Sequence, residues 1–250
     1  MFNDSNKIKS TFYVIAIILS VWIIFTELIF AGNKIFPSST LILISIYDLF
    51  KDYKFLSHLI STISVVYLSI IAVVLIVKTK FSFIDFHSKF VRYFLPIPNF
   101  FSIVPEIIIG LLLIFWLGDS YWGKLIYAMV LSGIMVYQSL VKFDENKITD
   151  KIIAAKSLSI SDQIINRKII WKYIEPEILN NFLDKHTFLW SSIIAYEYIQ
   201  NFNGVGFVLR NALQFNDLSI IISIIILFAI IIFISEKLLL TVINKYFVWN

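Results

Sequence analysis

Residues 218–240 read LSIIISIIILFAIIIFISEKLLL, a run in which only Glu236 and Lys237 interrupt apolar and small polar side chains. About 20 mostly apolar residues are enough for a helix to cross the hydrocarbon layer of a membrane. The stretch therefore predicts a transmembrane helix.

The composition of the whole chain supports the same interpretation. Of its 250 residues, 59% are hydrophobic and only 15% are charged, and the mean hydropathy is +0.84. Soluble domains are nearer half apolar and about a quarter charged. The absence of cysteine excludes disulfides, thiolate metal sites and cysteine nucleophiles.

Five further segments predict membrane crossings, which gives an all-α, polytopic fold with about six transmembrane helices. They are residues 12–31, 57–77, 99–117, 121–141 and 186–200. The last of them is short for a span and carries Glu197. The first is expected to remain as an anchor, because its apolar run is longer than that of a signal peptide. Residues 81–95 are apolar but hold Asp85, His87, Lys89 and Arg92, which predicts an amphipathic helix on the cytoplasmic membrane surface.

The distribution of basic residues predicts how the spans are oriented. If six spans alternate from a cytoplasmic N-terminus, sixteen Lys and Arg residues fall inside and five outside, which together make up the 21 in the chain. Cytoplasmic loops of membrane proteins carry the excess of basic residues. The asymmetry predicts that both termini are cytoplasmic, and it favours 186–200 as a real crossing. The five outside residues are Lys34, Lys51, Lys54, Lys124 and Arg210.

The only long polar segment is the predicted cytoplasmic loop 142–185. Its isoleucines recur at helical spacing, and the pattern breaks at Ser157, Ser159 and Ser161. Ser159, followed by Asp162 three residues later, is typical of a helix N-cap pair. We therefore expect a helix, a tight turn and a second helix. Their basic, amphipathic faces suit either an anionic lipid surface or a cytoplasmic protein partner.

Within this loop, residues 153–161 (IAAKSLSIS) resemble the E-A-A-x-x-L-G motif of ABC importer permeases. The matching residues are Ala154, Ala155 and Leu158. Ile153 stands where the family has glutamate, and Ser159 where it has glycine. The motif has the family's position, before the last two spans, and Pro176 follows at about the family's spacing.

Residues 188–212 resemble a second stretch of the family, W…E……G-x-G…A. The matching residues are Trp190, Glu197, Gly204, Gly206 and Ala212. Weaker matches are His58, Ser61, Arg92, Pro98, Pro105, Gly118 and Trp249. The order of these matches, over roughly residues 56–250, resembles the branch of nitrate, sulfonate, taurine and vitamin-precursor permeases.

The resemblance implies the MetI-like ABC permease fold, with residues 1–250 as a single transmembrane domain. Residues 12–31 would form a peripheral helix, 57–240 the core, and 142–185 the loop that couples to an ATPase. Ser159 is expected to supply the turn of this loop by capping. The expected ATPase-coupling residues are Ala154, Ala155, Leu158 and Ser159.

In such transporters the permease itself hydrolyses nothing. Two permease copies form the pathway in the cytoplasmic (inner) membrane, cytoplasmic ATPase subunits bind ATP and Mg, and an extracytoplasmic binding protein delivers the substrate. The resemblance implies no enzymatic activity, no cofactor in this chain and no nucleic-acid partner. It implies a small anion such as nitrate, a sulfonate or taurine, or a vitamin precursor, as the substrate.

Three acids, Glu27, Glu106 and Glu197, lie within or near predicted spans. A charge in lipid costs several kcal/mol, so each must be protonated, paired, or facing protein or water. Glu197 and Glu106, together with Gly204 and Gly206, are candidates for the pathway or a gate. A structural role, as a hydrogen bond between helices or a position near the membrane interface, is the equal alternative for Glu197 and the favoured one for Glu27.

The sequence also bears on three alternative functions: nucleotide binding, transport without an ATPase, and enzymatic activity within the membrane. Residues 118–125 (GDSYWGKL) match the phosphate-loop pattern, but Leu125 replaces its Ser or Thr, and the segment follows a span and not a strand. Two further classes stay open. A secondary transporter or channel acting alone would show internal repeats, and an integral-membrane enzyme would need a cluster of His, Asp or Glu.

Overall fold

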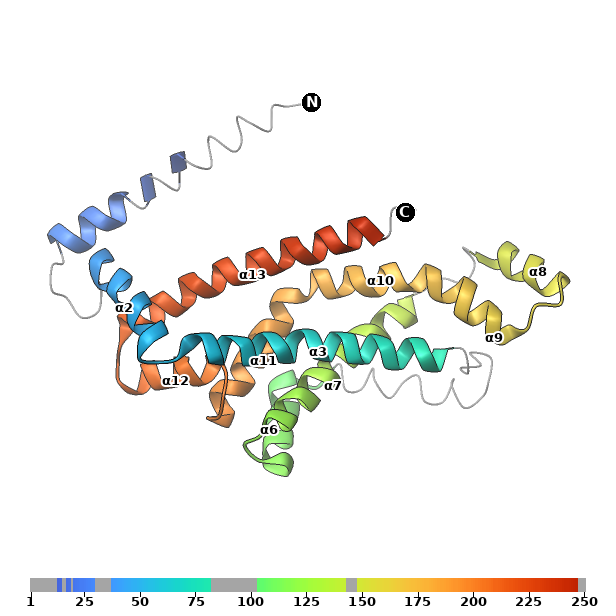
Figure 1. The fold of residues 1–250 in the computed structure, drawn as a ribbon, viewed down its shortest axis with the longest axis horizontal. Coiled ribbons are helices and arrows are strands. Elements are labelled where there is room, and N and C mark those ends of the chain that lie inside the picture. Colours follow the sequence, from blue (N-terminus) through green and yellow to red (C-terminus); the bar gives the residue numbers. More distant parts are fainter. Residues whose placement is uncertain are drawn as a thin grey trace. The chain divides into compact units, whose positions relative to one another are not determined.

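The structure, a computed structural model, describes residues 13–14, 17–18, 20–29, 37–81, 103–142 and 148–246. In these ranges every regular element is a helix, as Figure 1 shows. The predicted amphipathic helix 81–95 lies outside the described residues beyond Phe81, and so do Arg92, Pro98 and Trp249.

The chain forms two compact units. One comprises Met1–Leu56 with Leu209–Ala229, and the other Ser57–Val208 with Ile230–Asn250. The expectation of a single permease domain over 1–250 remains a prediction.

In the first unit, helix α2 (Ser39–Lys51) begins at Ser38, whose hydroxyl accepts a hydrogen bond from the Leu41 amide at 3.3 Å. This side-chain cap satisfies one of the free amides at the helix start. A π-helical turn, η1 (Phe25–Ile29), carries Glu27. Its carboxylate accepts hydrogen bonds from the amide and hydroxyl of Thr40, at 3.1 and 2.9 Å. Glu27 thus makes the structural contacts favoured for it from the sequence.

Three of the described helices are long and apolar enough to cross a membrane. They confirm the helices predicted at 57–77, 121–141 and 218–240. Each continues past the predicted segment, because the flanking residues extend the helix without a Pro or Gly break. The helices are α3 (Phe55–Phe81), α7 (Tyr121–Lys142) and α13 (Leu218–Tyr246).

Two helices at predicted spans are shorter. Helix α6 (Glu106–Leu117) has 12 residues and α11 (His186–Gln200) has 15, so they are about 18 and 22 Å long. The hydrocarbon layer is about 30 Å thick. Helix α6 begins after Pro105 and ends at Gly118, which has a φ of 63°. The crossings predicted at 99–117 and 186–200, and with them the total of six, remain predictions.

The loop 142–185 contains the predicted helix, turn and second helix. Helix α8 (Thr149–Ser157) is followed by a turn, and α9 (Asp162–Ile165) continues through the π-helical η3 (Asn166–Ile170) into α10 (Trp171–Asp184) (Figure 1). The expected N-cap pair is wrong. Ser161, not Ser159, occupies the cap position of α9, and its side chain makes no capping hydrogen bond.

The second unit packs α7 against α6, α10 and α11. Gly110 of α6 allows close approach, because a Cβ there would lie 3.2 Å from the Tyr196 ring and 3.3 Å from the Tyr127 ring. These two tyrosines, on α11 and α7, stack with ring centroids 4.7 Å apart. The close packing holds α11 beside α7 and so determines where the polar residues of α11 lie.

Candidate functional site

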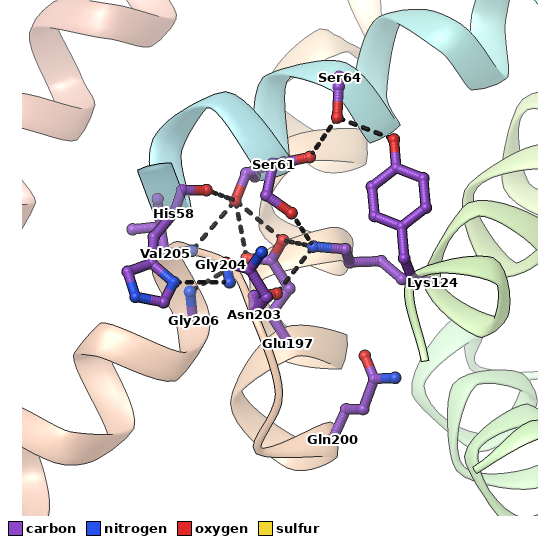
Figure 2. A network of polar contacts seen from close by, with 12 residues as sticks. His58, Ser61, Ser64, Lys124, Glu197, Gln200, Asn203, Gly204, Val205 and Gly206 are labelled. Atoms are coloured by element: carbon purple, nitrogen blue, oxygen red, sulfur yellow. Dashed lines mark hydrogen bonds and ion pairs between the residues drawn. The ribbon is translucent and has the colours of Figure 1, made fainter. Parts of the chain in front are cut away.

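A buried ion pair joins α7 to α11. Lys124 Nζ lies 2.7 Å from Glu197 Oε1, and both side chains are fully buried, with 0% exposed (Figure 2). Burying two charges is costly unless they are paired and their remaining hydrogen-bonding groups are satisfied. The surroundings of both groups therefore decide whether the pair is stable.

The ammonium group of Lys124 uses all of its donors. It donates to Glu197 Oε1 at 2.7 Å, to Ser61 Oγ at 2.9 Å and to the Asn203 carbonyl at 2.8 Å. A lysine has three N–H donors, so none is left unsatisfied. Ser61 belongs to α3, and the lysine therefore connects three parts of the unit.

The carboxylate of Glu197 caps helix α12 (Val205–Gln214). Its Oε2 accepts from the Gly206 amide at 3.1 Å, and the Thr62 hydroxyl lies 2.8 and 2.9 Å from its two oxygens. The Val205 amide donates in turn to the Thr62 hydroxyl at 3.0 Å. The first amides of a helix have no partner within it and favour a negative charge. Glu197 and Thr62 satisfy two of these amides, those of Gly206 and Val205. We call these groups the buried polar network: Ser61, Thr62, Lys124, Glu197, Asn203, Val205 and Gly206.

The two glycines of the G-x-G stretch are required by this packing. A Cβ at Gly204, whose φ is +135°, would lie 2.0 Å from the Glu197 carboxyl carbon. A Cβ at Gly206 would lie 2.1 Å from the Ile194 carbonyl oxygen. Neither distance is possible for a real side chain. Gly204 also donates its amide to His58 Nδ1 at 3.1 Å, so the stretch is hydrogen-bonded and closely packed.

The structure brings three of the four candidate pathway or gate residues together. Glu197, Gly204 and Gly206 meet, whereas Glu106 lies half-buried in the first turn of α6, and no described contact joins it to the network. Lys124, predicted from the sequence among the outside residues, is fully buried within the protein, and the side of the membrane on which this end of α7 lies remains a prediction. One feature of the sequence could have revealed the pairing of Lys124 with Glu197. Lys124 is the only charged residue within the predicted span 121–141, and Glu197 is the only one within 186–200.

The turn after α8 is made by the backbone conformation of Ser159. Its φ is +57°, its amide donates to the Lys156 carbonyl at 2.9 Å, and the Ile160 amide donates to the Ala155 carbonyl at 3.2 Å. This is the Schellman ending of a helix, whose left-handed residue is usually glycine. The left-handed conformation at this position explains why the family's motif has glycine where this chain has Ser159. The expectation that Ser159 turns the chain by capping is wrong.

The four expected coupling residues are not equally accessible. Ala155 is buried, with 4% exposed, whereas Leu158 is 73% exposed and Ala154 is exposed as well. Ile153, beside them on α8, is 60% exposed. An apolar surface on α8 is thus available to another molecule, while Ala155 packs within the loop.

These features define a helical membrane protein with an exposed helix–turn–helix segment (α8 and α9) and a buried ion pair within a polar network. Residues 81–248 match the family model described as "Binding-protein-dependent transport system inner membrane component". The match covers well over half of the chain, so the chain belongs to this family of ABC permeases. Permeases of this family are transport subunits that work with an ABC ATPase and a binding protein. No curated protein and no solved structure gave a significant match.

Proposed function

We propose that this chain is the permease subunit of an ABC importer, located in the cytoplasmic (inner) membrane. Two copies would form the substrate pathway, each crossing the membrane about six times with both termini in the cytoplasm. A pair of cytoplasmic ATPases would drive the cycle, and a binding protein would deliver the substrate from outside. Membership of the family and the three long apolar helices support this proposal.

The observation that carries the proposal is the geometry of α8 and its turn. Helix α8 has 9 residues, or about 13 Å, and its Schellman ending holds the chain in a defined reversal. Leu158 and Ile153 give it an exposed apolar surface. A short helix that keeps its shape and offers apolar side chains suits a groove on a partner protein. We therefore propose that α8 is the contact with the ATPase.

The test is recovery of the cognate ATPase with affinity-tagged permease after co-expression. Leu158→Glu places a charge in the proposed contact and should lower recovery about tenfold or more. Ile164→Glu is the matched control, because Ile164 is an exposed apolar residue (48%) of the same loop, on α9. Ala155→Arg is a poor probe, since its buried position would disturb the loop itself. Equal recovery with Leu158→Glu and wild type would overturn the coupling role.

The affinity-purified permease also distinguishes an importer subunit from a transporter that acts alone. An importer subunit should bring down an ATPase whose hydrolysis is inhibited by vanadate. A secondary transporter or a channel should bring down none. An enzyme would require its own catalytic cluster. The described residues include no group of three or more His, Cys, Asp or Glu placed to hold a metal ion.

We propose a small anion such as nitrate, a sulfonate or taurine, or alternatively a vitamin precursor, as the substrate. The support is the resemblance of residues 56–250 to that branch of permeases. The cognate binding protein should show ligand-dependent thermal stabilisation with one of these compounds, because a ligand that binds only the folded state raises its stability. Stabilisation by an unrelated class, such as peptides or sugars, would refute this choice.

A further inference from the structure

Helix α10 forms hydrogen bonds with two helices that precede it in the chain, α8 and α7. Lys151 of α8 donates a hydrogen bond to the hydroxyl of Tyr173, and its ammonium lies 4.7 Å from the centre of that ring. Near the other end, Asn181 Nδ2 donates to the Met135 carbonyl of α7 at 2.7 Å. Direct contacts thus join α8 to α10 and α10 to α7.

The same helix holds α3, which is remote in sequence. Lys78 Nζ forms an ion pair with Glu175 Oε1 at 2.8 Å, and it lies 5.8 Å from the centre of the Trp171 ring. Trp171 packs edge-on against Phe81, with ring centroids 5.3 Å apart. Both aromatic side chains are buried. The buried rings join the end of α3 to α10, and the ion pair is a second contact between the two helices.

Helix α3 connects this joint with the buried polar network. Ser61 and Thr62 lie on the same 27-residue helix as Lys78. From Ser61 to Lys78 the helix axis runs about 25 Å. An intact α-helix transmits an axial rotation or shift along its length, because each residue is hydrogen-bonded to the next turn. Lys78 and the residues that contact Lys124 and Glu197 thus lie on one continuous helix.

We infer that Glu175 is a positioning residue for transport: through its bond to Lys78 it passes the movement of α8 and α10 to α3. The inference rests on the proposed role of α8 as the ATPase contact. The ion pair is partly exposed, with 48% of Lys78 and 21% of Glu175 accessible. Exposed pairs add little to stability. If the ion pair had only a structural role, its loss should therefore have almost no effect. If Glu175 positions α3, the loss of the pair should weaken the coupling between the ATPase contact at α8 and α3.

The experiment uses the complete complex of permease, ATPase and binding protein in proteoliposomes. The chain has no cysteine, so Ile60→Cys, at an exposed position of α3, carries an environment-sensitive fluorophore. The emission change on adding ATP with vanadate reports the movement of α3 without knowledge of the substrate. Glu175→Gln should reduce this change about two- to threefold or more, while binding of the ATPase stays at the wild-type level. Lys78→Glu combined with Glu175→Lys should restore it.

Glu177→Gln is the matched control, because it removes the same charge two residues along α10, where no ion pair with α3 is described. It should respond like wild type. An unchanged response of Glu175→Gln, or no rescue by the charge exchange, would overturn the inference and leave the proposed function intact. Failure of the wild-type permease to bind an ATPase would refute the proposed function, and the inference with it.

Discussion

Replacing one member of the buried ion pair should destabilise the protein strongly. In Lys124→Met a side chain of similar length replaces the ammonium, and the Glu197 carboxylate keeps its contacts with Thr62 and Gly206 but loses its counter-charge. Removing one partner from a buried pair costs about 3–5 kcal/mol. We expect about 4 kcal/mol for Lys124→Met. We expect about 3 kcal/mol for Glu197→Gln, because the amide keeps one acceptor for the neighbouring donors.

The double variant decides whether the cost comes from the unpaired charge. With Lys124→Met and Glu197→Gln together no charge is left buried, so the loss should be about 4 kcal/mol and not the sum of about 7. The difference, about 3 kcal/mol, is the coupling energy of the pair.

The assay is reversible unfolding of the purified permease in mixed micelles, followed by far-UV circular dichroism. Lys168→Met, at an exposed position of η3, is the matched control and should change the free energy of unfolding by less than about 0.5 kcal/mol. Single variants that each cost below about 1 kcal/mol, or a double variant that costs the full sum, would refute the reasoning.

Three further predictions concern the two glycines, the turn after α8 and the orientation of the chain in the membrane. Gly204→Ala and Gly206→Ala should each prevent recovery of monodisperse protein in size-exclusion chromatography. Gly133→Ala, where a Cβ meets nothing within 4 Å, should be recovered like wild type, and equal recovery of all three would contradict the packing. Ser159→Gly should stabilise the loop by about 0.5–1 kcal/mol by removing left-handed strain, seen as slower proteolysis of the loop; faster cleavage would argue against the Schellman turn. Single cysteines at Ser159 and Asn211 should react with impermeant maleimide from opposite sides of the membrane, and same-side labelling would overturn the topology.

The long helices could be predicted from the sequence because apolar length alone specifies them. Residues 57–77, 121–141 and 218–240 each hold enough apolar residues for a span, and the structure has a helix at each. The short helices were harder to predict, because helix-breaking residues such as proline and glycine determine where they begin and end. Pro105 and Gly118 bound α6 more tightly than its hydropathy suggests.

The turn after α8 shows where a local rule fails. A serine three residues before an acid favours a helix N-cap, yet Ser159 adopts the left-handed conformation that ends the preceding helix. Both patterns use the same residues, and only the backbone hydrogen bonds distinguish them. The family's glycine at this position was the better guide, because it indicates a positive φ and not a cap.

The buried polar network could be predicted only in part. Glu197 was identified as a costly charge that needs a partner, but its partner lies 73 positions away. Lys124 was counted with the outside residues and noted in a phosphate-loop-like stretch, and no partner was predicted for it. Hydropathy and charge counts describe single segments, and pairing between segments depends on how the helices pack.

The separation of Lys124 from Glu197 has a consequence for biosynthesis. During translation Lys124 leaves the ribosome 73 residues before its partner, which at about 5–20 residues per second is roughly 4–15 s. Throughout this interval Glu197 has not yet been synthesised, and an unpaired charge in lipid costs several kcal/mol. We therefore expect the start of α7 to stay near water or the membrane interface until α11 has been synthesised. The second half of the nascent chain thus completes the insertion of the first.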